Sequence, residues 1–229
     1  MKKRYKLLII IVLGIILTIL INKNTERNKL NLVSIGDGLS LGMTEYKVAG
    51  PSFNDYLKEE LEKKEKINEF NNEFSQYYLT IHELNEYIED NQLGKYTRAP
   101  IKQVIAKADI LTISIGLDEL VIKSLNEKID EYIKNDFLLD YKILLSSIRE
   151  FYDKKIIILG LYSAYQLNKS DVLEINSKLN ILAGNYNCIY YDLFSYSLNN
   201  KYLNNNSYYI NYEGHKKIAN DLIKIIENK

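Results

Sequence analysis

Short, almost continuously apolar segments alternate with amphipathic helical segments along most of this chain. The clearest strand-like runs are residues 32–36, 109–116, 155–161 and 187–193, and Tyr77-Tyr78-Leu79 is a shorter candidate. Strands that lack polar alternation are buried on both faces, which is typical of a parallel sheet covered by helices. The sequence therefore predicts an α/β fold, a three-layer α/β/α sandwich with a parallel sheet of about five strands.

Helix signals separate these runs. Ser52 with Asp55, and Thr80 with Glu83, have the spacing of residues that cap a helix N-terminus. After Ser52, one helical stripe of apolar residues is predicted to continue to Phe70. Further helices are predicted from Pro100, through residues 119–153 with a break near Asn135-Asp136, from Ser170-Asp171 to Ala183, and from Asn211 onward.

Four loops follow predicted strands or precede the last helix, at residues 36–42, 116–119, 161–165 and 204–211. In open parallel sheets, ligands bind outside the carboxyl ends of the strands, so these loops are expected to share one rim. The first loop is a glycine-punctuated strand-to-helix turn, a place where backbone N–H groups are available to a ligand. Its central residue is Gly38, which has no side chain.

Composition excludes several classes of function. Thirty basic and thirty acidic residues give a net charge of zero and are interspersed, so a nucleic-acid partner is not expected. Two histidines and one cysteine leave little material for a zinc or redox site. Cys188 lies in an apolar run and is expected to be a buried thiol. No cofactor is predicted.

The first 29 residues are predicted to be a signal anchor and a short linker, followed by one domain over residues 30–229. Four basic residues precede an apolar run from Leu7 to Ile21, and no Ala-x-Ala-like cleavage site follows it. This pattern favours an uncleaved membrane segment with the domain outside the cytoplasm. A cleaved peptide and a secreted domain are the alternative. An exported domain suggests a cell-envelope glycan, lipid or protein as its partner.

Four segments, in the same order along residues 30–229, resemble the motifs of the SGNH (GDSL-type) hydrolases. They are Gly36-Asp37-Gly38-Leu39-Ser40, Ser114-Ile115-Gly116-Leu117-Asp118, Gly160-Leu161-Tyr162, and the run from Tyr209 to Ala219. The resemblance implies a flavodoxin-like fold and an origin among esterases and lipases.

The departures from the family pattern fall on the catalytic positions. The resemblance places the nucleophilic serine at Gly38, the general-base histidine at Tyr209, its orienting aspartate at Asn206 and an oxyanion-binding asparagine at Asp118. Gly38 has no nucleophilic oxygen, and a tyrosine with an ordinary pKa near 10 is a poor base at neutral pH. The family's second oxyanion donor is a glycine after the second strand, and no glycine lies between Gly50 and Gly94.

These substitutions predict a catalytically inactive pseudohydrolase, which either binds a ligand at its rim or binds a partner through another surface. The expected binding residues are Asp37, Gly38, Ser40, Gly116, Asp118 and Tyr209. The alternative is an active ester hydrolase with relocated chemistry on Ser40 and His215, which requires mutual hydrogen-bond reach. A metal site at Asp37, Asp118, Glu119 and His215 and a flavodoxin-like cofactor site are weaker alternatives.

Overall fold

The computed structural model describes residues 13–15, 29–204 and 206–227. Most of the predicted signal anchor, Leu7 to Ile21, lies outside these residues. Within the part of the chain that is described, no helix has the length and apolar character needed to cross a membrane.

The centre of the domain is a five-stranded parallel sheet with the order β2-β1-β3-β4-β5. The strands are β1 (Leu30–Gly36), β2 (Ile67–Asn71), β3 (Ile110–Ser114), β4 (Lys155–Leu159) and β5 (Ile189–Tyr191). β3 is buried at every position, as its uninterrupted apolar sequence predicts. The predicted number of strands and their parallel arrangement are confirmed.

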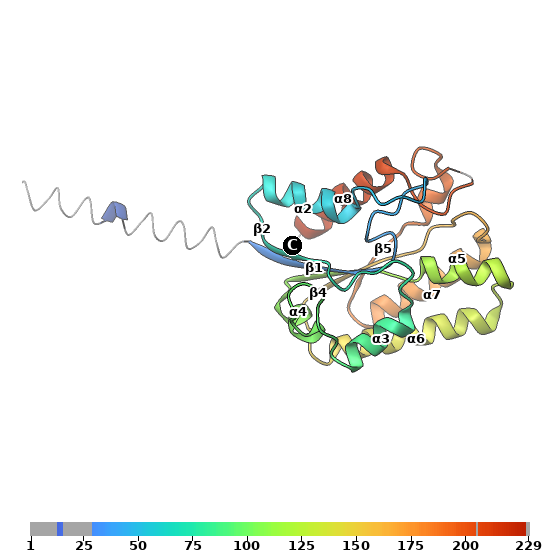
Figure 1. Ribbon diagram of the computed structural model, residues 1–229, viewed down its shortest axis with the longest axis horizontal. Coiled ribbons are helices and arrows are strands. Elements are labelled where there is room, and N and C mark those ends of the chain that lie inside the picture. Colours follow the sequence, from blue (N-terminus) through green and yellow to red (C-terminus); the bar gives the residue numbers. More distant parts are fainter. Residues whose placement is uncertain (1–12, 16–28, 205, 228–229) are drawn as a thin grey trace, which may run out of the picture.

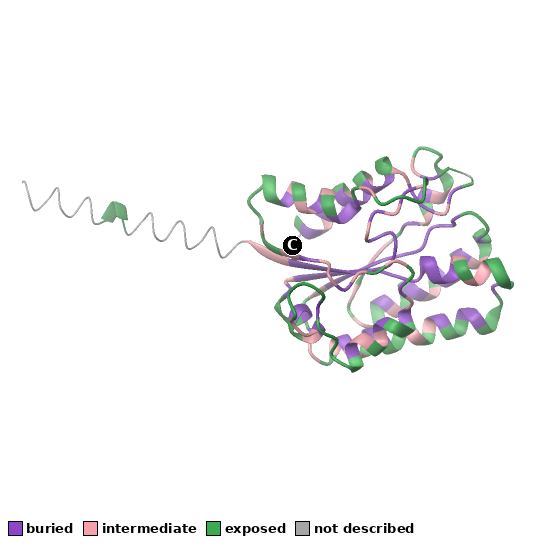
Figure 2. Cartoon of the chain, viewed as in Figure 1, coloured by how far each residue is buried: buried purple, intermediate pink, exposed green. Residues whose placement is uncertain are grey.

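Helices cover both faces of the sheet (Figure 1). One layer pairs α2 (Phe53–Lys63) with α8 (Tyr212–Glu227). The opposite layer contains α3 (Ile81–Glu89), α4 (Ile101–Lys107), α5 (Leu117–Asn126), α6 (Glu131–Arg149) and α7 (Lys169–Asn185), and a short 3₁₀ helix, η1 (Phe194–Leu198), follows β5. The three central strands β1, β3 and β4 are mostly buried and the outer helix faces are exposed, so the three-layer sandwich holds two apolar interfaces, one on each side of the sheet (Figure 2).

Local capping explains where several helices begin. Ser52 and Asp55 form a reciprocal capping box at α2, and Thr80 and Glu83 form another at α3. Asn211 Oδ1 accepts the Gly214 N–H at 3.1 Å at the start of α8. These predicted helix starts are confirmed, because each depends on a side chain close in sequence to the N–H groups it satisfies.

Two predicted elements are wrong. The helical stripe after Ser52 ends at Lys63, and residues 67–71 form the edge strand β2 instead. Tyr77-Tyr78-Leu79 is a turn rather than a strand. β2 pairs on one side only, with β1, and its solvent-facing residues give it no continuous apolar run that periodicity could detect.

Two boundaries shift without changing the architecture. The break in the 119–153 region falls between α5 and α6, where Asp130 caps α6, and not near Asn135. α7 is capped by Asn168 rather than by Ser170.

The expectation that the Cys188 thiol is buried is not met. Cys188 is a free thiol that is only partly buried.

Candidate functional site

The turn after β1 is held close to the end of β3. The Asp37 N–H donates to the Ser114 carbonyl at 2.9 Å, and the Ser40 N–H donates to the Asp37 carbonyl at 3.0 Å. A Cβ atom at position 36 would overlap the Ser114 carbonyl, so only glycine allows β1 and β3 to end this close together. The turn is therefore a fixed platform that presents the Gly38 N–H at the carboxyl edge of the sheet.

Asp118 enters this platform from the first turn of α5. Gly116 precedes the helix with a φ of +103°, a left-handed conformation that glycine adopts readily, and it turns the chain from β3 into α5. The Asp118 carboxylate is buried. Its Oδ2 accepts the Gly38 N–H at 2.9 Å and the Tyr78 N–H at 3.1 Å, and its Oδ1 accepts the Tyr209 hydroxyl at 3.0 Å.

Three donors from three separate loops thus converge on one carboxylate. Two of them are backbone N–H groups, the arrangement with which acyl-transfer enzymes bind an oxyanion. Here the acceptor on the two N–H groups is the Asp118 carboxylate, a side chain of the protein itself. The site is satisfied internally, since a buried carboxylate with several hydrogen bonds needs no external ligand.

The glycine at position 38 is required by this carboxylate and not by backbone conformation, because its φ is not positive. A Cβ atom there would lie 2.8 Å from Asp118 Oδ2 and 3.2 Å from the Tyr209 ring. Any side chain at this position therefore collides with Asp118 in its present place. The absence of a side chain at position 38 and the carboxylate at position 118 are physically linked.

Asp37 helps to hold Asp118 in this position. Its carboxylate accepts the Leu39 N–H at 3.3 Å and the Asp118 N–H at 3.2 Å. Complete burial, with the neighbouring Asp118 charge as a smaller contribution, raises the pKa of Asp37 well above its ordinary value. Asp37 positions Asp118 and does not face solvent, because its side chain is enclosed by the turn.

Tyr209 acts as a hydrogen-bond donor in this site. Burial raises the pKa of its phenol, and the charge of Asp118 and the bond to it raise the pKa further. The hydroxyl therefore keeps its proton at neutral pH and cannot serve as a general base. Asn206, at the position of the family's orienting aspartate, is exposed at the surface.

Ser40 and His215, the residues of the relocated-hydrolase alternative, are not joined. Both are fully buried. Ser40 Oγ lies against Gly36 inside the turn and has no hydrogen-bond partner among the described residues. The His215 Nδ1 atom accepts the Phe53 N–H at 3.1 Å. One of the two ring nitrogens is therefore already bonded to the N-terminus of α2.

The structure also brings Tyr78 to the site, a residue that no sequence pattern predicts there. Tyr78 has a φ of +62°, a conformation that costs a tyrosine and that glycine would adopt freely. It supplies the donor from the loop after β2, where the resemblance places a glycine. Residue type carries no signal for this role, since only the backbone N–H takes part.

The four rim loops are brought together as the strand order predicts. Besides the Asp118 contacts, the Tyr165 N–H donates to the Ser207 carbonyl at 2.9 Å, and the Tyr162 hydroxyl donates to the Tyr208 carbonyl at 3.1 Å. Glu119 turns away from Asp118, accepting the Ile81 N–H at 3.2 Å and pairing with Lys123 at 2.8 Å. Within the described ranges, no group of three or more acidic, histidine or cysteine side chains could hold a metal ion.

Solved structures of ester hydrolases have the same architecture. A lipase/acylhydrolase from Enterococcus faecalis aligns with a TM-score of 0.62 at 15% identity, over 86% of this chain and 95% of that one. An acetyl xylan esterase, AlAXEase, aligns with a TM-score of 0.65 at 15% identity, over 86% and 100%. AlinE4, an SGNH-hydrolase family esterase, aligns with a TM-score of 0.51 at 15% identity, over 71% and 75%.

This chain has the SGNH-hydrolase fold. No family model matches the sequence, and no curated protein matches it either. At this level of identity the similarity establishes the fold alone. The expected flavodoxin-like sandwich is confirmed, while the roles of Asp37, Gly38, Ser40, Gly116, Asp118 and Tyr209 in binding a ligand stay predictions.

The steric link between Gly38 and Asp118 can be measured with a double-mutant cycle in urea. Gly38→Ala is expected to lower the free energy of unfolding by about 1–3 kcal/mol, as overpacking does. In an Asp118→Ala background the same change is expected to cost at least about 1 kcal/mol less, a coupling typical of residues in contact.

Gly184→Ala provides the matched control, because a Cβ atom at that helical glycine meets nothing within 4 Å. Its effect is expected to add to that of Asp118→Ala without coupling. Additive behaviour of Gly38→Ala and Asp118→Ala would contradict the contact.

His215 makes the stability of the domain depend on pH. Burial lowers the pKa of its imidazole from 6.5 to about 4, so the unfolded chain takes up a proton first as the pH falls. The stabilisation is complete above about pH 6.5. It is expected to decline by up to about 1.4 kcal/mol per pH unit between pH 6.5 and 4.

Urea unfolding across this pH range, compared with His215→Gln, isolates the effect. The variant should lack this component of the slope even if its overall stability is lower. His82→Gln is the control, because His82 is exposed on α3. Equal slopes for the wild-type chain and His215→Gln would show that His215 is not a buried neutral imidazole.

Proposed function

We propose that this chain is a membrane-tethered pseudohydrolase, an extracytoplasmic SGNH-fold domain that binds a cell-envelope ligand or partner without hydrolysing it. The observation that carries the proposal is the Asp118 carboxylate, which lies on the Gly38 and Tyr78 N–H groups. A substrate carbonyl cannot enter this position while the carboxylate fills it, and a developing oxyanion would be repelled by its charge.

The groups needed for attack and proton transfer are also missing from the site. No hydroxyl stands at position 38, and the Tyr209 phenol is held protonated by burial and by Asp118. The relocated pair receives no support from the geometry, since Ser40 Oγ lies inside the turn and His215 Nδ1 is engaged by Phe53. A working nucleophile and its base must be within hydrogen-bond reach.

Tethering and export rest on the sequence of the first segment. Basic residues at the N-terminus followed by the apolar run Leu7 to Ile21 favour an anchor with the domain outside the cytoplasm. Labelling of the domain from outside intact cells, combined with carbonate extraction of membranes, tests this placement. A domain released as a soluble, shortened chain would support the secreted alternative.

Hydrolysis assays test the absence of catalysis. The full-length chain, purified in detergent, is expected to release p-nitrophenol from p-nitrophenyl acetate and butyrate at the rate of the buffer alone. It is likewise expected to release no acetate from acetylated xylo-oligosaccharides, the type of substrate suggested by the structurally similar acetyl xylan esterase.

The matched variants are Ser40→Ala and His215→Ala, each compared with the wild-type chain by circular dichroism to verify folding. Turnover by the wild-type chain that disappears in either folded variant would overturn the pseudohydrolase proposal and favour the relocated hydrolase.

A further inference from the structure

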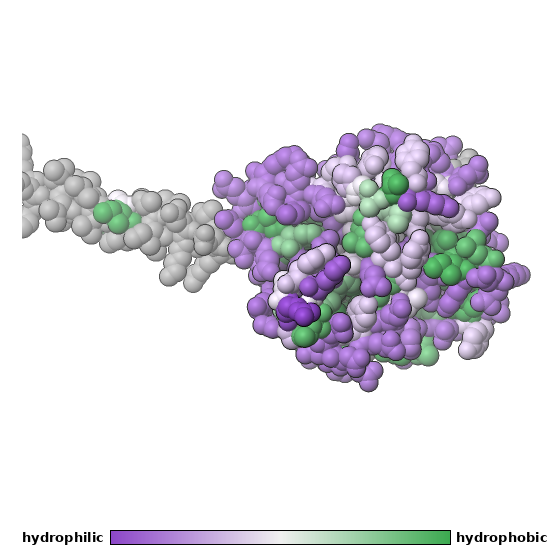
Figure 3. Space-filling model, viewed as in Figure 1, coloured by the Kyte–Doolittle hydropathy of each residue, from purple (hydrophilic) through white to green (hydrophobic). Residues whose placement is uncertain are grey.

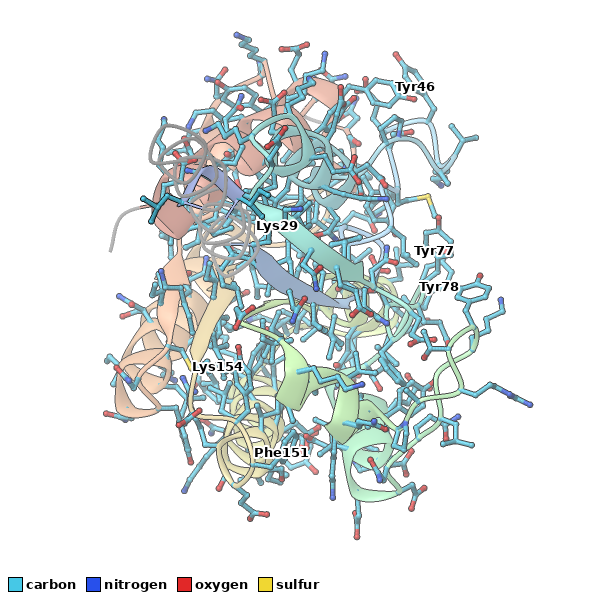
Figure 4. The ribbon with its side chains drawn as sticks, turned by 90° about the vertical axis from the view of Figure 1, so that its left-hand side faces the viewer. Lys29, Tyr46, Tyr77, Tyr78, Phe151 and Lys154 are labelled. Atoms are coloured by element: carbon cyan, nitrogen blue, oxygen red, sulfur yellow. The ribbon has the colours of Figure 1, made fainter. Side chains whose placement is uncertain are left out.

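A cleft of about 500 Å³ lies beside the filled site, between the loop that follows β2 and the loop that joins α3 to α4. Its volume is within the range of small-ligand sites. Its lining includes Leu41 and Tyr77, whose hydroxyl donates to the Leu41 carbonyl at 3.4 Å, and also Leu93 and Tyr96. Figure 4 shows Tyr77 and Tyr78 on the same side of the domain as Tyr46.

The outer wall of this cleft is held in place by Glu73. Its carboxylate accepts the Asn71 amide at 2.8 Å and the backbone N–H groups of Tyr96 and Thr97 at 3.0 Å each. Burial opposes ionisation, but these hydrogen bonds outweigh it and lower the pKa of Glu73. Gly94 lies directly on this carboxylate, with no room for a side chain. The cleft is therefore preformed.

The inner wall is equally fixed. The Gln76 N–H donates to the Gly36 carbonyl at 3.0 Å, and Ser75 Oγ donates to the Ser34 carbonyl at 3.2 Å, which fastens the loop to β1. The Tyr87 hydroxyl donates to Gln76 Oε1 at 3.2 Å. A rigid cleft costs little ordering when it binds a ligand.

The lining combines tyrosine rings with uncharged amides. Tyr96 is 76% exposed and Leu93 is 52% exposed, so both stand at the mouth without packing partners that bury them. Within the described part of the chain, the side-chain amides of Asn72 and Gln92 make no hydrogen bond to the protein. Glu73 and Lys95 are the charged residues of the lining, and their charges balance.

We infer that this cleft binds an uncharged, polyhydroxylated chain, a neutral oligosaccharide. A sugar ring presents an apolar C–H face that packs on a tyrosine ring, and hydroxyl groups along its edge. Each amide offers both donors and an acceptor, which suits hydroxyls that also donate and accept. This inference rests on the proposed binding function, because it assigns the ligand to a place where Asp118 does not block it.

Two other chemistries fit less well. An acyl chain requires a continuous apolar lining, whereas amides and a carboxylate interrupt this one. An anionic ligand requires more than the single Lys95, which lies 5.4 Å from the Tyr96 ring centre. On the face shown in Figure 3 the domain is mostly hydrophilic with small, separate apolar patches. That face therefore shows no broad apolar surface of the kind that binds a protein or a membrane.

Calorimetric titration of the full-length chain with xylohexaose and with the hexamer of N-acetylglucosamine tests the inference. At least one is expected to bind with a Kd between about 1 μM and 1 mM. Tyr96→Ala and Gln92→Ala are each expected to weaken that binding about tenfold or more, which corresponds to about 1.4 kcal/mol. Tyr132→Ala is the matched control, since Tyr132 is 77% exposed on α6 and is not part of the cleft.

Three results would overturn the inference: no binding of either hexasaccharide, binding unaffected by both cleft variants, or Tyr96-dependent binding of decanoate instead. None of these bears on ester hydrolysis, which is followed separately by acetate release. Sugar binding together with turnover would overturn the pseudohydrolase proposal and leave the cleft assignment standing.

Discussion

The carboxylate of Asp118 is the centre of this structure's candidate site. It links the turn after β1, the loop after β2, the first turn of α5 and the loop before α8, through donors at Gly38, Tyr78 and Tyr209. Leaving such donors buried without an acceptor would cost about 1–3 kcal/mol each. The Asp118 carboxylate accepts all three donors, and so it offsets that cost and stabilises the rim.

The residues at the positions that the resemblance marks as catalytic are consequently not independent. A carboxylate at 118 excludes a side chain at 38, and it turns the hydroxyl of Tyr209 into a donor whose proton is retained. Placing a serine at position 38 alone would therefore create a collision with Asp118 rather than a nucleophile. The cleft that we propose as the ligand site is lined by other residues and does not include the position that the Asp118 carboxylate fills.

Sequence patterns predict the layers of this fold well and its edge poorly. β3 and β4 are buried on both faces, so their apolar runs reveal them, and capping residues such as Thr80 act on neighbours in the chain. β2 is an edge strand with exposed positions, and its apolar spacing predicts part of a helix instead. Tyr78 could not be predicted as a donor, because its role depends on a backbone N–H and a left-handed φ, which residue type does not encode.

Amide NMR of Gly38 and Tyr78 tests the central claim most directly. If the Asp118 carboxylate accepts both N–H groups, their protons will resonate downfield and exchange slowly in the wild-type chain. Both will shift upfield together, and exchange faster, in Asp118→Ala. Amide signals of Gly38 and Tyr78 that are unaffected by Asp118→Ala would contradict the placement of the carboxylate on these two N–H groups.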